Sequence, residues 1–175
     1  MQRKNEIVQL ETKRLVLRNW NESDLNDFIE IFSSKETRVP HGLSKIDTES
    51  KAMYFIEDFK IKRNNYAVVL KSESKVIGTI GLNEDFLFNE NTRNLGFSIN
   101  KKYWNMGYLS ESLDAILKNA YKFTDFVSIT HSKGNDVSKH IAEKYNFIQK
   151  SNVDVERGNK TNSIVEAYYV LDVRK

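Results

Sequence analysis

With 175 residues, the chain is long enough to bury a core as one domain, and its lack of cysteine excludes disulfides, thiolate catalysis and Cys-ligated zinc. Its 27 Lys and Arg against 24 Asp and Glu leave a formal net charge of +3, too small for a dedicated nucleic-acid binder, in which basic residues would form a stripe. No stretch approaches the roughly 18 apolar residues of a membrane span, and the first residues lack the apolar centre of a signal peptide, so we expect one soluble, cytoplasmic domain over residues 1–175.

The first half of the chain alternates between two periodicities. Alternation of apolar and charged residues is typical of a half-buried strand, whereas apolar residues three and four positions apart are typical of a helix. Asn21 or Ser23 is the expected N-cap of the first helix, and Asp47 or Thr48 that of the second. The patterns predict, in chain order, a strand at Arg14–Trp20, helices at Asn21–Ser34 and Asp47–Lys62, and a hairpin of strands at Tyr66–Lys71 and Lys75–Asn83.

The second half predicts a regular alternation of strands and helices. In chain order we expect a strand at Asn94–Asn100, a helix at Tyr108–Phe123, a strand at Phe126–Ser132, a helix at Asn135–Phe147 and a strand at Ser163–Val173. Residues 94–132 form a strand–helix–strand unit, whose two strands should be parallel. Together with the earlier hairpin, this order predicts an α+β fold.

The loop before the helix at Tyr108–Phe123 contains Gly107, one of only seven glycines. The N–H groups of a helix's first turn lack intrahelical partners and carry a partial positive charge, so they attract anions. Gly107 would let a ligand approach the backbone closely, and Lys101 and Lys102 add positive charge just upstream. The loop matches neither the G-x-x-x-x-G-K nor the G-x-G-x-x-G phosphate motif. By itself it is therefore either an ordinary turn or an anion site.

Three stretches resemble the GCN5-related N-acetyltransferase superfamily, particularly the branch that acetylates the N-termini of ribosomal proteins. Leu10–Phe32 is similar to the opening strand and helix of that branch, Leu95–Leu113 to the Gly-containing acetyl-CoA segment, and Asn135–Phe147 to the later N-x-x-S helix. The resemblance covers nearly the whole chain. It implies a single α/β domain with a mixed, mostly antiparallel sheet, in which two central parallel strands splay apart and helices flank the sheet.

The resemblance implies acetyl-CoA as co-substrate, and no metal. The pantetheine would pair with Phe97, Ser98 and Ile99, and a backbone N–H near Ile99 would polarise the thioester carbonyl. Asn135 and Ser138 would also contact the cofactor, although both residue types are common at a helix start. The pyrophosphate would contact backbone N–H groups of the loop and helix start, namely Asn105, Met106, Gly107, Tyr108, Leu109 and Ser110.

The reaction implied by the family is direct attack of an amine on the thioester, without an acyl-enzyme intermediate. Many relatives protonate the departing thiolate with a tyrosine, whose position here is Ala142. In the ribosomal branch a serine at the start of the same helix takes that role, and Ser138 matches it. Glu84 or Asp85, after the strand that precedes the cofactor strand, is the expected general base; the competing interpretation is a solvated loop.

The expected function is acetyl transfer to a primary amine, and the branch resemblance favours a protein N-terminal α-amino group. Small-molecule amines, such as polyamines or antibiotics, are alternative acceptors, because the same fold serves them. A catalytically degenerate module that binds CoA or a peptide is a further alternative, supported by Leu109, Ala142 and the lack of an obvious base. We expect Arg38–Asp47 and the second helix to form the acceptor wall, expect no nucleic-acid or membrane partner, and leave a homodimer open.

Overall fold

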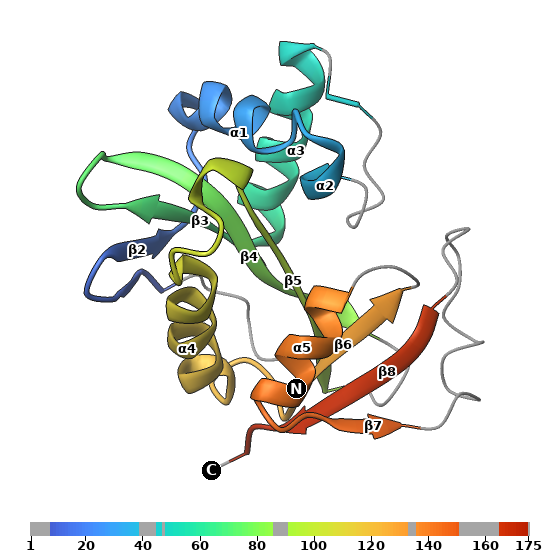
Figure 1. Ribbon diagram of the computed structural model, residues 1–175. Coiled ribbons are helices and arrows are strands. Elements are labelled where there is room, and N and C mark those ends of the chain that lie inside the picture. The colour runs from blue at the N-terminus through green and yellow to red at the C-terminus, as the bar shows by residue number, and fades with distance from the viewer. Residues whose placement is uncertain are drawn as a thin grey trace. The chain divides into compact units, whose positions relative to one another are not determined.

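A computed structural model describes residues 8–38, 45–46, 48–85, 91–132, 136–150 and 165–174 (Figure 1). The chain forms two compact units. The first unit is built from residues 4–81 and 96–119, and the second unit from residues 82–95 and 120–175. Strands β4 (Lys75–Asp85) and β5 (Thr92–Ile99) each belong partly to one unit and partly to the other.

The first unit combines antiparallel strands with helices α1 to α4. Its strand order is β1-β2-β3-β4-β5, and the first four strands pair antiparallel in a register that places Leu17 opposite Val68 and Val68 opposite Gly78. The predicted first strand, both helices and the hairpin are confirmed. Besides its parts of β4 and β5, the unit contains β1 (Leu10–Glu11), β2 (Leu15–Arg18), η1 (Glu22–Asp24), α1 (Leu25–Ile31), α2 (Lys35–Arg38), α3 (Glu49–Lys62), β3 (Asn65–Leu70), η3 (Lys101–Tyr103) and α4 (Tyr108–Ala120).

Local sequence explains where α3 begins and ends. The Thr48 hydroxyl accepts the backbone N–H of Lys51 at 3.2 Å, which satisfies one N–H of the first turn and confirms Thr48 as the N-cap. Arg63 closes the helix in the left-handed region, with φ of 48°. Lys60 and Lys62 in the last turn complement the partial negative charge of that end.

The core of the first unit is a cluster of rings from α1, α3 and the segment after β2. Helices α1 and α3 pack against each other (Figure 1). Phe28 is fully buried, and its ring centroid lies 5.3 Å from that of Trp20 and 4.7 Å from that of Phe32. Phe55 and Phe59 of α3 complete the cluster. Burying a side chain of this size contributes roughly 2–3 kcal/mol, so these rings hold the two helices together.

The second unit contains a parallel strand pair. In addition to its parts of β4 and β5, it consists of β6 (Phe126–Ser132), α5 (Asp136–Lys144), β7 (Ile148–Lys150) and β8 (Val165–Asp172), with strand order β5-β6-β8-β7. β5 runs parallel to β6 from the pair Thr92 and Phe126 to the pair Asn94 and Ser128, whereas β6, β8 and β7 pair antiparallel. Helix α5 packs on β6 (Figure 1). The mixed sheet with one parallel pair and flanking helices confirms the expected fold class.

Several element ends differ from the sequence prediction. Helix α4 stops at Ala120 rather than Phe123, and the Ala120 carbonyl accepts the backbone N–H groups of both Phe123 and Thr124 in a closing turn. Asn146 follows α5 with φ of 58°, the left-handed conformation that asparagine tolerates. The short elements β1, α2 and β7 show too little periodicity to be predicted. No helix in the described ranges is long and apolar enough to cross a membrane.

Candidate active site

The end of β5 is held closely against β4 within the first unit. Asn100, directly after β5, donates its backbone N–H to the carbonyl of Ile77 at 2.8 Å. A Cβ on Gly78 would lie 2.4 Å from the carbonyl oxygen of Ser98, so this approach requires glycine. Because backbone groups of successive strand residues face opposite edges, the N–H and C=O of Ile99 face the edge away from β4.

The loop between β5 and α4 has a conformation suited to anions. Asn105 and Gly107 both have positive φ, of 60° and 78°. Positive φ at two positions so close together is typical of a turn, and turn backbone can direct successive N–H groups into an anion-binding concavity. Helix α4 begins at Tyr108, so its first N–H groups also have no acceptor within the helix. Trp104 donates its indole N–H to the Ile99 carbonyl at 2.6 Å and thereby ties the loop to the end of β5.

The exposure of the predicted cofactor residues changes along this segment. Ser98 and Ile99 are buried, and Phe97 is half-buried. Asn105, Met106 and Gly107 are exposed, and Tyr108, Leu109 and Ser110 are half-buried. The exposed part is therefore the loop with positive φ, where a phosphate would have to approach.

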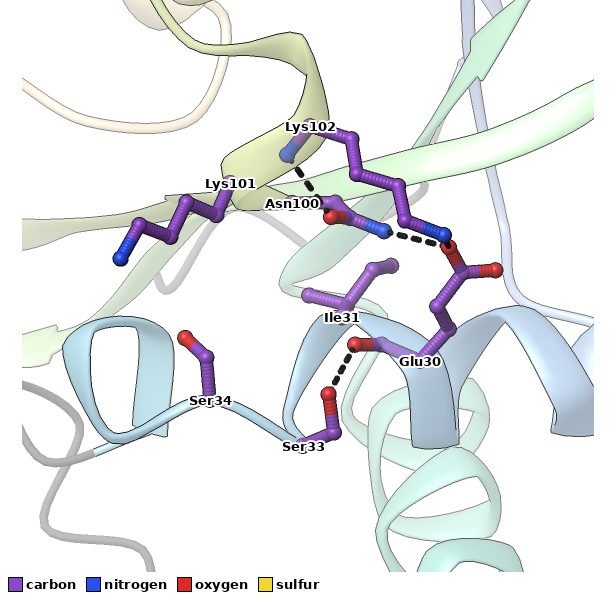
Figure 2. A pocket seen from close by; sticks show the side chains of 7 residues that line it. All are labelled: Glu30, Ile31, Ser33, Ser34, Asn100, Lys101 and Lys102. Atoms are coloured by element: carbon purple, nitrogen blue, oxygen red, sulfur yellow. Dashed lines mark hydrogen bonds and ion pairs between the residues drawn. The ribbon is translucent and has the colours of Figure 1, made fainter.

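A cavity of about 370 Å³ opens beside the end of β5 in the first unit. Asn100, which is only 5% exposed, links two sides of this cavity: its amide donates to Glu30 at 3.2 Å, and its Oδ1 accepts the backbone N–H of Lys102 at 3.1 Å. Apart from Ile31 the lining is polar. Figure 2 shows all of the lining side chains, which are Glu30, Ile31, Ser33, Ser34, Asn100, Lys101 and Lys102.

Glu30 is the only carboxylate among the residues that line this cavity. It accepts the ammonium of Lys102 at 2.7 Å and that of Lys75 at 2.9 Å. The hydrogen bonds from Lys102 and Lys75 lower the pKa of Glu30 from 4.5 to about 2, although partial burial opposes them. Glu30 is therefore ionised at neutral pH, already paired with two ammonium groups, and unsuited to accept a proton.

The two predicted base candidates lie within β4 in the second unit, so the expectation that they follow this strand is wrong, and their surroundings differ. Asp85 is 7% exposed and accepts hydrogen bonds from the Ser128 hydroxyl and, at 2.7 Å, from the Tyr168 hydroxyl. Asn94 in turn donates its amide to the Ser128 hydroxyl at 3.1 Å. The Glu84 side chain is 65% exposed, and its Oε1 lies 3.9 Å from Nη1 of Arg93. Of the two candidates, Glu84 is the one whose carboxylate is exposed to solvent.

Helix α5 carries the remaining predicted site residue that the structure describes. Ser138 lies in its first turn and is 6% exposed. Ala142, four residues later on the same face, is fully buried, so this position offers no hydroxyl. Asn135 lies outside the described residues, as does most of the predicted acceptor wall at Arg38–Asp47.

The sequence prediction did not include Arg14 as a neighbour of the loop. Its guanidinium donates to the carbonyl of Met106 at 2.9 Å, across 92 residues of sequence. The apolar–charged alternation placed Arg14 at the start of a strand, but such a pattern carries no information about a distant partner.

Comparison with known proteins identifies the family. The family described as "Acetyltransferase (GNAT) domain" matches residues 14–148. The chain is 32% identical over 120 residues to YnaD of Bacillus subtilis, an uncharacterized N-acetyltransferase. That alignment covers 66% of this chain, and the chain spans about 66% of the length of the relative.

Solved structures share the fold. A GNAT-family acetyltransferase from Bacillus anthracis has a TM-score of 0.76 at 24% identity. The superposition covers 95% of this chain and 99% of the Bacillus anthracis chain. The microcin self-immunity acetyltransferase MccE, in complex with acetyl-CoA and AMP, has a TM-score of 0.74 at 13% identity. The superposition covers 92% of this chain and 93% of the MccE chain. An acetyltransferase from Salmonella typhimurium that modifies the N-terminal serine of a ribosomal subunit protein has a TM-score of 0.69 at 12% identity, with 92% and 96% covered. Since the matched residues include the Gly107 loop and α5, the chain belongs to the GNAT acetyltransferase family.

Proposed function

We propose that the protein is an acetyl-CoA-dependent N-acetyltransferase that transfers acetyl directly to a primary amine. The observation that carries this proposal is the pair of left-handed residues, Asn105 and Gly107, directly before α4 in a chain of the GNAT family. In this arrangement the backbone N–H groups of Asn105–Ser110 bind the donor pyrophosphate. The complex of MccE with acetyl-CoA supports the same donor for this chain by analogy of fold.

The proposed reaction needs one hydrogen-bond donor for the thioester oxygen. The amine attacks the carbonyl carbon, a C–N bond forms, the C–S bond breaks, and CoA departs as a thiolate. We assign the Ile99 N–H as the donor to the developing oxyanion, because it faces the edge of β5 away from β4. The Asn100 N–H is excluded, since the Ile77 carbonyl already accepts it. The pantetheine lies along Phe97, Ser98 and Ile99.

Two proton transfers complete the proposed reaction. Ser138 protonates the departing thiolate and, with Asn135, contacts the cofactor. Glu84 removes the proton from the ammonium, directly or through water. Asp85 suits this role less well, because two hydroxyl groups already donate to its carboxylate. A peptide α-amino group has a pKa of only about 8, so a weak base is sufficient.

The acceptor that we favour is a protein N-terminal α-amino group. The Salmonella neighbour modifies an N-terminal serine, which supports this acceptor by analogy. The cavity beside β5 offers a mostly polar lining to an acceptor, in which Glu30 is already paired with Lys75 and Lys102. Its lining includes Asn100, the residue directly after the proposed oxyanion donor Ile99. An amine that enters this cavity would therefore approach the thioester.

The test of the proposed function is release of CoA, measured with a thiol reagent. The chain has no cysteine, so the reagent reports on CoA alone. The acceptor panel contains peptides with a free N-terminus, N-terminally blocked peptides with a free lysine, polyamines and aminoglycosides. We expect release with the free N-terminal peptides and little with the blocked ones. Release with small amines only would correct the acceptor, and release with none would contradict the transferase proposal.

One observation favours a second candidate, a CoA-binding module without catalysis. The position from which many relatives supply a catalytic tyrosine is occupied by Ala142, which is fully buried. Such a module would bind acetyl-CoA in a calorimetric titration but would release no CoA with any amine. The two experiments together therefore separate the candidates.

A further inference from the structure

Arg14, one residue before β2, contacts the Gly107 loop and the first turn of α4 within the first unit. Its Nη1 donates to the Met106 carbonyl at 2.9 Å, and its Nη2 lies 3.4 Å from the place of a Cβ on Gly107. The guanidinium carbon lies 4.3 Å from the centroid of the Tyr108 ring. The Nε donates to Glu111 at 2.6 Å. One side chain from the beginning of the chain thus spans the whole bend between the loop and α4.

Glu111 anchors this arginine. Its carboxylate also accepts the Thr12 hydroxyl at 2.5 Å and the backbone N–H of Arg14 at 2.8 Å. Burial raises the pKa of Glu111, but the hydrogen bonds from Thr12 and Arg14 outweigh it, so the pKa lies below its usual value. Glu111 is therefore an ionised side chain in the first turn of α4, where it would repel a bound phosphate if no cation neutralised it.

We propose that Arg14 is a positioning residue of the donor site, which holds the Asn105–Gly107 loop in its anion-binding conformation and neutralises Glu111. This inference rests on the proposed function, because the ligand of the loop is the donor pyrophosphate. By donating to the Met106 carbonyl, the guanidinium fixes the peptide between the two left-handed residues. A planar fork can bind that carbonyl and the Glu111 carboxylate at the same time, which a lysine ammonium cannot do in the same geometry.

The experiment compares two acetyl donors that differ in phosphate. Acetyl-CoA carries the pyrophosphate, whereas S-acetylpantetheine has the same thioester and no phosphate. For Arg14→Gln we expect the ratio of kcat/KM for acetyl-CoA to kcat/KM for S-acetylpantetheine to fall about tenfold, the loss of one charge-assisted contact. The fall should arise from a higher KM for acetyl-CoA at nearly unchanged kcat. Arg14→Lys, which keeps the charge, should lie between Arg14→Gln and the unaltered protein.

Arg18→Gln is the matched control. Arg18 lies on β2, close to Arg14 in sequence, and forms two hydrogen bonds to Asp24, at 2.8 and 2.9 Å. The substitution Arg18→Gln also breaks an ion pair, so it should lower the stability of the fold. It should not change the ratio of kcat/KM for acetyl-CoA to kcat/KM for S-acetylpantetheine. If Arg18→Gln changed that ratio as much as Arg14→Gln did, the effect would belong to general destabilisation and the inference would fail.

Further outcomes separate this inference from the proposed function. An unchanged ratio in Arg14→Gln would overturn the positioning role, and Arg14→Lys behaving like the unaltered protein would overturn the argument from the planar fork. If the unaltered protein itself did not prefer acetyl-CoA to S-acetylpantetheine, the proposed phosphate site would be wrong whatever Arg14 does.

Discussion

In the first unit, the interior between α1 and α3 is built from aromatic rings, with Phe28 in contact with Trp20 and Phe32. In the second unit, the interior at the end of β4 contains the Asp85 cluster, in which the hydroxyl groups of Ser128 and Tyr168 donate to the carboxylate of Asp85. Both regions are closed to water, but they are stabilised in different ways. Ring packing has no strict direction and spreads its free energy over many weak contacts. The Asp85 cluster depends on a few directed hydrogen bonds, each of which leaves a buried polar group unsatisfied if its partner is removed.

The largest expected effect is on the ring cluster. Phe28→Ala should lower the free energy of unfolding by about 4 kcal/mol, because it removes a fully buried ring and leaves a cavity. Tyr54→Ala on α3 is the matched control, since this ring is 68% exposed and its loss should cost less than about 1 kcal/mol. Urea denaturation measures the free energy of unfolding of both variants. Equal losses in the two variants would show that the rings between α1 and α3 do not form the core.

The Asp85 cluster should respond with a smaller loss but with strong coupling. Asp85→Ala should cost about 3 kcal/mol, because the Ser128 and Tyr168 hydroxyls lose their acceptor, and Tyr168→Phe about 1 kcal/mol. The double variant should cost clearly less than the sum, by about 1 kcal/mol, since both changes remove the same hydrogen bond. Additive losses, measured in the same denaturation experiment, would mean that the hydroxyl of Tyr168 does not bind Asp85 in solution.

A different response is expected from Ser138, another residue of the second unit with a buried hydroxyl. If it protonates the thiolate, Ser138→Ala should lower kcat at least about tenfold. The affinity for acetyl-CoA, measured by calorimetry, should change little. Unchanged turnover would remove Ser138 from catalysis. A loss of affinity with constant kcat would instead make it a cofactor-binding residue only.

The smallest effect concerns the ion pairs of Glu30 with Lys75 and Lys102 in the first unit. Because the pKa of Glu30 is lowered from 4.5 to about 2, its ion pairs stabilise the fold fully above pH 4.5, and this contribution is lost as the pH falls towards 2. Glu30→Gln should remove about 1 kcal/mol at neutral pH, as expected for partly exposed ion pairs. The difference between the two proteins should vanish in thermal melts near pH 2. A constant difference at every pH would contradict this origin.

Sequence reasoning recovered the regions whose stabilisation is local or periodic. The apolar stripe of α4 and the Thr48 cap depend on neighbours within a few residues, so their signals lie in short stretches of sequence. The same local reasoning located Gly107 in the loop before α4, whereas its positive φ is a finding of the structure.

The contacts that could not be predicted join residues far apart in the chain. Asp85 binds Ser128 across 43 residues and Tyr168 across 83. Arg14 binds Glu111 across 97 residues. None of these residue types has a periodicity that identifies a distant partner, because a polar side chain is specified by geometry rather than by pattern. Sequence therefore located the loop but not the arginine that supports it.

The position of Trp104 at the start of the Gly107 loop has a practical consequence. The chain has only two tryptophans, and their surroundings differ greatly: Trp20 is 1% exposed, whereas Trp104 is 41% exposed at the start of the Gly107 loop. A Trp20→Phe variant would therefore emit from one indole, placed where the donor is proposed to bind. Its fluorescence would provide an intrinsic optical signal for occupancy of the loop, so that titrations would need neither a dye nor an engineered label.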